Sequence, residues 1–384
     1  MTTNAGVRAG SAAGAVRLRS LREIDDDAVG RWWALAGRAA EPNPFAGPGV
    51  VLPAAAHLPD GGRAWLLSVE RGGEMTFALP VVRTPAARLR PFAALTAWQG
   101  YFPPLATPLL DPAYGPESWR AVRSALAGRA VWLLLDPVTA DGPVIRALLR
   151  AGGPGAAPRV LETVERAGAF PDDPADRDRV RSSPKTRKSL EARRRKLARM
   201  AGADAVTFRV DPGEPVPDTL VEDFLKLEAA GWKGAAGTAL ASRPETAAFF
   251  RDVVRAQAAR RGAQVVGVRC GERLVAATVN LVAGGGLFFY KIAYDEEFRT
   301  ASPGRILMAD NLDAFADDPS LAFADSCADP GASLSNQVLR DRRPVARVLV
   351  PASGGTAALV TEAALAGRAA RRRLRALRRG GRVP

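Results

Sequence analysis

The residues best suited to chemistry lie between positions 288 and 307, in the stretch FFYKIAYDEEFRTASPGRIL. Its first part has the apolar character of a strand, and Ser302-Pro303 has the serine and proline typical of a helix start. A helix N-terminus presents unpaired amides and a positive dipole end, so it can hold a phosphate. Gly304 would let that ligand approach the backbone, and Arg305 would add a charge. The same pattern also describes an ordinary helix capped by a serine, so the local pattern leaves both interpretations open.

Three polar side chains precede this loop on the predicted strand. Lys291 lies within the apolar stretch 287–292, where a charge needs a partner or a ligand unless strand alternation points it to solvent. Tyr290 and Tyr294 can protonate a leaving thiolate or a ribose oxygen, or they can be core aromatics. We therefore include all three among the candidate site residues.

A second group of candidates lies upstream, at the end of a predicted helix. Glu228 comes just before Gly231-Trp232-Lys233-Gly234. Its carboxylate can deprotonate or position an acceptor amine, or it can be a solvated acid on a helix surface. Trp232 can line an acceptor pocket or belong to the core, and Lys233 is a candidate for binding the substrate.

A third group follows a short predicted strand near the end of the second half. Asp325 and Asp329 flank Ser326-Cys327 there, at a strand end where site residues often lie. Arg342 and Arg343 can form internal ion pairs with these aspartates or bind an anionic substrate.

Cysteine and histidine chemistry has little support in the sequence. A nucleophilic pair would require His57 to reach Cys327 from the other half of the chain, and nothing in the pattern orients such a pair. The chain has a single histidine and two cysteines, Cys270 and Cys327, without the spacing of metal ligands. We therefore expect no metal and no disulfide framework.

The loop that follows Tyr294 resembles the donor loop of GNAT acetyltransferases, in which a strand precedes Gln/Arg-x-x-Gly-x-Gly/Ala and a leucine-containing helix. Residues 299–304, RTASPG, followed by Ile306 and Leu307, fit this frame with Ser302 in place of the first glycine. Pro303 has no N–H to donate, and no tyrosine follows Tyr294 to match the general acid of many family members. The resemblance implies that the loop wraps the pyrophosphate of coenzyme A, with these contacts to the donor: Ile292, Ala293, Tyr294, Arg299, Ser302, Gly304 and Arg305.

A wider set of motifs resembles the GNAT-like family named for cellulose biosynthesis, also called BioF2-like acetyltransferases. Those motifs are Lys185-Thr186-Arg187-Lys188, Glu228 with Gly231-Trp232-Lys233-Gly234, Tyr290-Lys291-Ile292-Ala293-Tyr294-Asp295, Ser302-Pro303-Gly304, Asp325-Ser326-Cys327-Ala328-Asp329 and Asp341-Arg342-Arg343-Pro344. That family is related to the Fem-type transferases, which add amino acids from aminoacyl-tRNA to cell-wall precursors and have two tandem GNAT units. The resemblance covers residues 181–350 well and residues 20–170 loosely.

The resemblance implies an acyltransferase that moves an acyl group, acetyl in the first instance, directly from acyl-coenzyme A to an amine or hydroxyl acceptor. It assigns Glu228, Lys291, Tyr294 and Asp325 to catalysis and Trp232, Lys233, Tyr290 and Asp329 to the acceptor, which is a small molecule, a saccharide or a peptide. One alternative is a Fem-type transferase that takes its aminoacyl group from tRNA. Another is a GNAT-fold binding protein without catalysis, which Ser302 and the missing tyrosine favour.

The surrounding pattern predicts an α/β fold, with an α+β mixed sheet in two tandem GNAT-like units. We place the units at residues 16–172 and 180–352, with a linker at 171–174 and a basic tail, helical or partly disordered, at 353–384. The proline-rich segments 42–59, 91–116 and 212–217 are predicted to be mostly loop. Predicted strands are 63–69, 75–82, 131–135, 159–164, 264–269, 274–282, 286–292, 321–326 and 344–350, and predicted helices are 25–40, 144–150, 184–200, 219–230, 244–261 and 303–315.

The net charge of +14 comes from two short segments. Residues 181–199 hold nine Lys and Arg against one acid, and residues 368–382 hold eight arginines, which leaves 37 basic and 39 acidic residues elsewhere. The basic helix and the tail can therefore be solvated, or they can bind tRNA, anionic lipid head groups or an anionic saccharide carrier. The cations assigned to that role are Lys185, Arg187, Lys188, Arg194 and Arg195. No apolar run reaches the length of a membrane span or a signal peptide, so we expect a cytoplasmic protein, with peripheral membrane contact left open.

Overall fold

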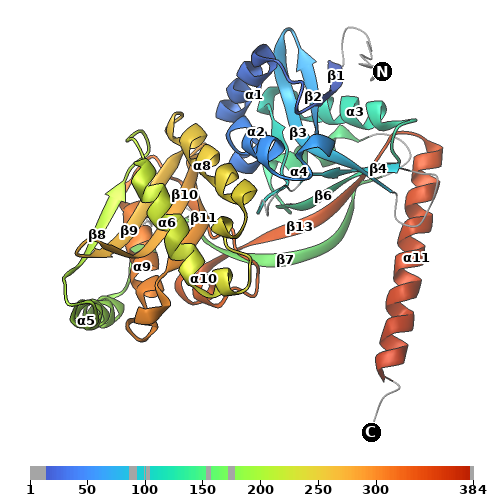
Figure 1. Cartoon of the computed structure of the whole chain (residues 1–384). Helices are drawn as coiled ribbons and strands as arrows, with labels where there is room; N and C mark the ends of the chain where they lie inside the picture. The colour runs from blue at the N-terminus through green and yellow to red at the C-terminus, as the bar shows by residue number, and fades with distance from the viewer. Residues whose placement is uncertain are drawn as a thin grey trace.

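Two lobes share one mixed sheet in the computed structural model (Figure 1), which describes residues 14–85, 93–98, 100, 104–152, 157–171 and 178–380. The order in the 13-stranded sheet is β1-β2-β3-β4-β6-β13-β7-β12-β11-β10-β9-β8, and β5 pairs with β3. The elements of the first half are β1 (Ala15–Ser20), α1 (Asp26–Arg38), η1 (Pro44–Ala46), α2 (Pro48–His57), η2 (Gly61–Arg63), β2 (Trp65–Arg71), β3 (Glu74–Pro85), β4 (Ala93–Ala97), β5 (Leu109–Leu110), η3 (Pro112–Tyr114), α3 (Gly115–Leu126), β6 (Trp132–Thr139), α4 (Pro143–Ala151) and β7 (Arg159–Ala169). Those of the second half are α5 (Pro184–Ala201), β8 (Ala205–Val210), α6 (Asp218–Ala230), α7 (Trp232–Ala235), η5 (Leu240–Ser242), α8 (Pro244–Ala258), β9 (Ala263–Cys270), β10 (Arg273–Ala283), β11 (Gly286–Tyr294), η6 (Glu296–Ala301), α9 (Pro303–Asp317), β12 (Phe323–Asp325), α10 (Ser333–Val338), β13 (Asp341–Pro351) and α11 (Gly355–Gly380).

The two halves of the chain exchange strands at the middle of the sheet. β13, the last strand of the second half, pairs with β6 of the first half on one side and with β7 on the other. β7, the last strand of the first half, pairs in turn with β12 of the second half. Figure 1 shows β7 and β13 as two long strands that run from one lobe to the other. Each predicted unit thus contributes a strand to the other unit's part of the sheet, and the predicted linker residues 172–174 lie outside the described residues.

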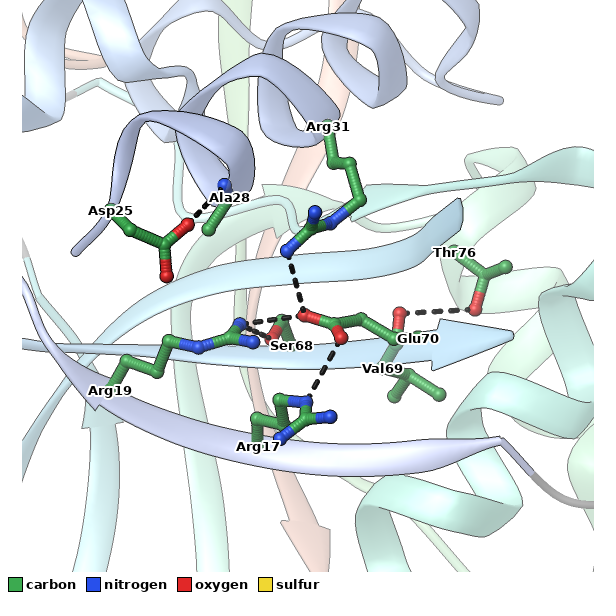
Figure 2. Close-up of polar contacts among 9 residues, drawn as sticks. All are labelled: Arg17, Arg19, Asp25, Ala28, Arg31, Ser68, Val69, Glu70 and Thr76. Carbon is green, nitrogen blue, oxygen red and sulfur yellow. Dashed lines mark hydrogen bonds and ion pairs between the residues drawn. The ribbon is translucent and has the colours of Figure 1, made fainter. Parts of the chain in front are cut away.

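The first strand is anchored at the sheet edge by charge pairs around Glu70 (Figure 2). The Glu70 carboxylate accepts hydrogen bonds from Arg17 at 2.9 Å and Arg19 at 2.6 Å, and Arg31 of α1 lies 4.0 Å away. Burial alone would raise the pKa of Glu70, but the bonds from these arginines outweigh it and hold the pKa below its usual range. The cluster therefore pairs β1 with β2 and helps to seat α1 over the sheet.

The second lobe has helices on both faces of its strands. Consecutive residues of β9 show this: Val265 packs in a core with Phe224 of α6 and Phe250 of α8, whereas Val266 packs with Leu307 of α9. Because neighbouring residues of a strand point to opposite faces, α6 and α8 cover one face and α9 covers the other. The basic helix α5 lies against α9 and buries Leu197 there.

Helix α2 joins the two lobes on the α6–α8 face. It packs against α8, and one buried core continues from Val50 and Val51 of α2 to Phe250 of the second half. His57, at the end of α2, hydrogen-bonds Asp252 of α8 at 2.6 Å through its Nε2. This contact holds the His57 ring against α8 of the second half.

The mixed α/β class and most predicted elements of the second half are confirmed, including the strands around the candidate loop. The prediction of mostly loop at 42–59 is wrong, because α2 occupies ten of those residues. Pro48 stands at a first-turn position, where a missing N–H costs no helical bond, and Val50, Val51, Ala54 and Ala55 are buried. In segment 91–116 the described residues include β4 and β5, and α3 begins at Gly115. Strands β1 and β8 and helix α3 were not predicted: each strand has only six residues, and α3 begins inside a segment predicted to be loop.

The basic tail forms the helix α11, which extends away from both lobes (Figure 1). Its first turns lie beside β13, where Val360 and Ala364 are buried against Trp132 and Leu349. Residues 381–384 lie outside the described residues. Among the helices described, none is long and apolar enough to span a membrane.

Candidate functional site

The site opens where two neighbouring strands of the second lobe separate. β11 and β12 are parallel and pair only over Gly286–Phe288 and Phe323–Asp325. β11 continues beyond that pairing to Tyr294, so one edge of its last residues is left without β12 beside it. The register of β11 against β10 shifts at the same place, because Asn280 lies opposite Phe289 and Val279 lies opposite Lys291, so Tyr290 forms the bulge. A bulge of this kind re-aims side chains and is frequent beside functional sites.

A cavity of about 1450 Å³ lies against this separated region. It is larger than the roughly 300–1,000 Å³ usual for one small ligand, so it has room for two substrates at once. From the second half it is lined by the β11 residues, the loop before α9 and the segment after β12. From the first half and the exchanged strands it is lined by Pro104, Asp136, Pro137, Glu162, Val164, Arg166, Val345, Ala346 and Arg347.

The loop that enters α9 has a strained backbone at Ser302. This residue has φ 55° and ψ 56°, a left-handed conformation that a glycine adopts at much lower cost. Its hydroxyl does not cap α9 but accepts a hydrogen bond from Arg193 of α5 at 2.6 Å. The interpretation of Ser302 as an ordinary helix cap is therefore wrong, because its hydroxyl makes no hydrogen bond to the first amides of α9. The family pattern has its first glycine at this position.

Gly304 follows in the first turn of α9, and its lack of a side chain has a structural reason. A Cβ at this position would lie 3.2 Å from Cδ1 of Tyr294 and 3.5 Å from Cδ2 of Leu334. The glycine thus lets the Tyr294 ring pack against the helix start, and both residues line the cavity. Among the described residues, the Gly304 amide has no protein acceptor, as expected for the first turn of a helix.

Several cations surround this helix start. Arg299 and Arg305 line the cavity, and Arg305 also donates to Oε1 of Gln337 at 2.7 Å. From α5, Arg193 reaches Ser302, and Lys196 donates to the carbonyl of Thr300 at 3.1 Å. The basic helix is therefore packed against the loop, and part of its charge faces the helix start.

The cations of α5 that the sequence assigned to anion binding divide into two groups. Arg194 contacts Asp310 of α9, so it is engaged inside the second lobe. Lys185, Arg187, Lys188 and Arg195 are exposed on the outer face of the helix.

Glu228 and Lys233 form a pair behind the strand. Glu228 is buried, and its two carboxylate oxygens accept hydrogen bonds from Lys233 Nζ at 2.7 Å and from the Leu240 amide at 2.8 Å. Lys233 Nζ also donates to the carbonyl of Ile292 at 3.0 Å. Lys233 lines the cavity and Glu228 does not, so the geometry favours Glu228 as the residue that positions Lys233 against β11.

Lys291 lies in the cavity wall on β11. Burial lowers its pKa from 10.5 to about 8, with Glu228 acting to raise it and Lys233 to lower it further. Its Nζ is 5.3 Å from the ring centre of Tyr290, a buried residue that also stacks on Phe250. A lysine with such a pKa exchanges protons near neutral pH, unlike an exposed one.

The remaining candidate residues of the second half differ in their burial and in whether they line the cavity. Trp232 lines the cavity with 60% of its surface exposed, so the interpretation as a core residue is wrong. Its amide donates to Glu296 at 2.9 Å, which fixes the start of α7. Ile292 and Asp329 line the cavity, whereas Ala293 is buried on β11 and does not.

Asp325 is completely buried and does not line the cavity. Arg343 lies 2.6 Å from its Oδ2, and its Oδ1 accepts the Cys327 amide at 2.7 Å. The internal ion pair predicted for Arg343 is thus confirmed, while Arg342 contacts the backbone carbonyls of Asn336, Leu339 and Asp341 instead. Cys327 has a positive φ of 52°, and burial raises the pKa of its thiol well above the usual range. A thiol held neutral in this way is a poor nucleophile.

Sequence reasoning missed the contribution of the first half to the cavity. Glu162, Val164 and Arg166 follow one another at every second position of β7 and so share one strand face. Asp136, which precedes Pro137 on β6, contacts Arg347 of β13. The alternation at 162–166 could have indicated a common face, but no local signal shows that β7 meets the second lobe.

Comparisons with known proteins agree with this geometry. Residues 184–322 match the family model for the Acetyltransferase (GNAT) domain. The crystal structure of FemX superimposes with a TM-score of 0.52 at 10% identity, covering 83% of this chain and 95% of that one. A conserved protein of unknown function from Bacteroides thetaiotaomicron gives 0.50 at 10% identity, covering 85% and 99%. No curated protein matches the chain. The second half therefore contains a region that matches the GNAT domain model, and the chain as a whole has the fold of these solved structures.

Proposed function

We propose that this chain, with its GNAT domain and the fold it shares with FemX, is an acyltransferase that uses acyl-coenzyme A. In this proposal an acyl group, acetyl in the first instance, passes directly to an amine or hydroxyl acceptor. The observation that carries it is the open edge of β11, which leads within one cavity to a helix start surrounded by arginines. Assignment to the cellulose-biosynthesis-associated family is part of the proposal and rests on the sequence motifs.

The donor would lie along Ile292 and Tyr294, with its pyrophosphate at the start of α9. Pro303 removes one amide from the usual cradle, so the Gly304 amide needs help from side chains. Arg193, Arg299 and Arg305 supply positive charge around the same turn. Charge-assisted hydrogen bonds from arginine are roughly twice as strong as neutral ones, so they can compensate for the missing amide.

The acceptor would enter from the first-half side of the cavity, between Trp232 and strand β7. Lys291 would take the proton from an acceptor ammonium, because a lysine with a pKa of about 8 can be neutral at working pH. The freed amine attacks the thioester carbonyl, and the tetrahedral intermediate collapses with release of the thiolate. We assign the protonation of that thiolate to the hydroxyl of Tyr294, the last residue of β11, whose ring packs against the helix start. Asp325 and Glu228 would act by positioning Arg343 and Lys233.

An aminoacyl-tRNA donor is the second candidate function. The observation in its favour is the set of exposed cations on α5, whose last turns contact the donor loop. Arg195 lies in those last turns, whereas Lys185, Arg187 and Lys188 lie in the first turns of the helix, toward the other end of α9. Backbone phosphates of a tRNA could contact that face while the aminoacyl end enters the cavity.

Calorimetric titration separates these functions. We expect acetyl-coenzyme A at millimolar concentration to bind and to raise the melting temperature. Aminoacyl-tRNA should be titrated at 50 and 200 mM salt, since phosphate contacts lose affinity steeply with salt. Absence of acetyl-coenzyme A binding together with salt-dependent tRNA binding would refute the first function and support the second. Replacing the four exposed α5 cations by alanine should weaken the binding of tRNA and leave the binding of acetyl-coenzyme A unchanged.

A further inference from the structure

Arg166 occupies an unusual place in the floor of the cavity. It lies on β7 on the same strand face as Glu162 and Val164, directly opposite Arg343 of β13 in the register of the two strands. Gly168, two residues further along β7, pairs with Asp325 at the end of β12. Arg166 is thus close to the point where β11 and β12 separate, although it comes from the first half of the chain.

The Arg166 guanidinium is buried and incompletely hydrogen-bonded. The residue is 5% exposed, and its Nε and Nη1 have no hydrogen-bond acceptor among the described residues. Its Nη1 is 3.8 Å from Oδ1 of Asp325, which is too long for a hydrogen bond. Arg343 lies 2.6 Å from Oδ2 of Asp325 as an ion pair without hydrogen-bond geometry, and the Cys327 amide donates to Oδ1 of Asp325 at 2.7 Å.

The charges around Arg166 do not balance. Two guanidiniums, Arg166 and Arg343, face the single carboxylate of Asp325. Glu162, the other acid on this face of β7, lies four residues away and is exposed to solvent. Around Asp325, two guanidiniums therefore share one carboxylate, which leaves one positive charge in excess within that cluster. A buried donor without an acceptor costs about 1–3 kcal/mol, and more for a charged group, so an anion that enters the cavity would remove that cost.

We propose that Arg166 binds a carboxylate of the acceptor, and that the acceptor is an amino acid or a peptide-like amine with a free carboxylate. This inference rests on the proposed function, since it names the class of acceptor for the same cavity. A planar guanidinium pairs well with a carboxylate. A doubly charged phosphate fits less well, because Glu162 lies on the same strand face and Asp325 lies beneath. Holding the carboxylate at Arg166 places the acceptor beside Tyr290 and Lys291 of β11.

The first test measures binding without any donor. The standard L-amino acids, matched with their carboxamides, are titrated at millimolar concentration while the melting temperature is recorded. We expect at least one amino acid to raise the melting temperature, and we expect its carboxamide to bind at least tenfold more weakly. Arg166→Gln should lose that binding at least tenfold, Arg166→Lys should keep part of it, and Arg159→Gln should behave as wild type. Arg159 is the matched control, because it is exposed on the same strand and pairs with Glu362 outside the cavity.

The inference is overturned if no acid binds, if acids and amides bind alike, or if Arg166→Gln binds the acid as wild type does. Stronger stabilisation by inorganic phosphate than by every acid would assign Arg166 to a phosphate instead and would also overturn it. If Arg166→Gln does not fold, the acid-to-amide ratio of Arg166→Lys decides.

A second test, release of thiol from acetyl-coenzyme A, separates the two proposals. With Arg166→Gln the preference of kcat/KM for acid over amide should fall to near one. If acetyl-coenzyme A is not used at all, the proposed donor is wrong, and the donor-free titration still decides the role of Arg166.

Discussion

Lys291→Met tests whether the half-buried lysine of β11 exchanges the proton in the reaction. Burial lowers the pKa of Lys291 from 10.5 to about 8. At pH 7 roughly one molecule in ten holds this lysine neutral, and at pH 8 about half do. If the neutral amine accepts the acceptor's proton, kcat/KM should rise about tenfold per pH unit below pH 8 and level off above it.

The same pKa predicts an effect on stability. Because the pKa is lower in the folded protein than in the unfolded chain, the unfolded chain binds more protons between pH 8 and pH 10.5, and stability rises with pH across that interval. The cost of burying the charged amine is therefore fully present below pH 8 and disappears as pH approaches 10.5. The two pKa values correspond to roughly 3 kcal/mol at pH 7, which falls to roughly 1.5 kcal/mol at pH 9.5.

Methionine has a similar length and no charge, so Lys291→Met should remove this cost. Urea denaturation should find the variant more stable than wild type at pH 7, by up to about 3 kcal/mol, and the gain should shrink by about half at pH 9.5. Its kcat/KM should fall and lose the rise below pH 8. Lys226→Met is the matched control, since Lys226 is 79% exposed on α6. If Lys291→Met kept the wild-type pH profile of kcat/KM, Lys291 would not be the base. If the difference in unfolding free energy between the variant and the wild type did not change with pH, the argument that burial lowers the pKa of Lys291 would be refuted as well.

Three further substitutions test the cavity. Gly304→Val should weaken the binding of acetyl-coenzyme A at least tenfold by calorimetry, because its Cβ would lie 3.2 Å from the ring that bounds the helix start. Gly30→Val, at an exposed position of α1 with open space around its Cβ, should leave that affinity unchanged. Equal affinities of the two variants would remove the donor assignment. Lys233→Met should cost about 3–5 kcal/mol in urea denaturation, since it leaves the buried Glu228 carboxylate without its cation; a cost below about 1 kcal/mol would contradict the pairing. Ser302→Gly should relieve a left-handed backbone that costs about 1 kcal/mol or more, so calorimetry should find acetyl-coenzyme A binding at least as tight as in wild type; weaker binding would show that the serine hydroxyl matters more than the strain.

The local pattern was sufficient for the backbone of the donor region. The apolar run before Tyr294 predicted a strand, and Pro303 with Gly304 predicted the start of a helix, because residue-level preferences act over a few neighbouring positions. The same reasoning failed where a local preference had two outcomes. Ser302 could cap the helix or adopt a left-handed turn, and only the packing of α5, which presents Arg193, shows which one holds.

The local sequence pattern also could not predict which side chains of this region are buried. Glu228 has the sequence context of a surface acid, yet it is 4% exposed because α7 folds back and brings Lys233 to it. Trp232 has the composition of a core residue, yet it stands largely exposed at the cavity. Which side of a helix end faces the interior depends on the next element along the chain, and that element's position is a tertiary property.

By itself the sequence determined the α/β class, the strand and helix that frame the donor loop, and a charged lysine in an apolar strand. Only the tertiary structure decided that β13 inserts between β6 and β7, which brings Arg166 and Arg343 together beside the cavity. These arginines lie far apart in the sequence, and each has an unremarkable local context. Pairing between distant strands is selected by burial of the whole sheet and by hydrogen bonding along its edges, so no window of neighbouring residues contains it.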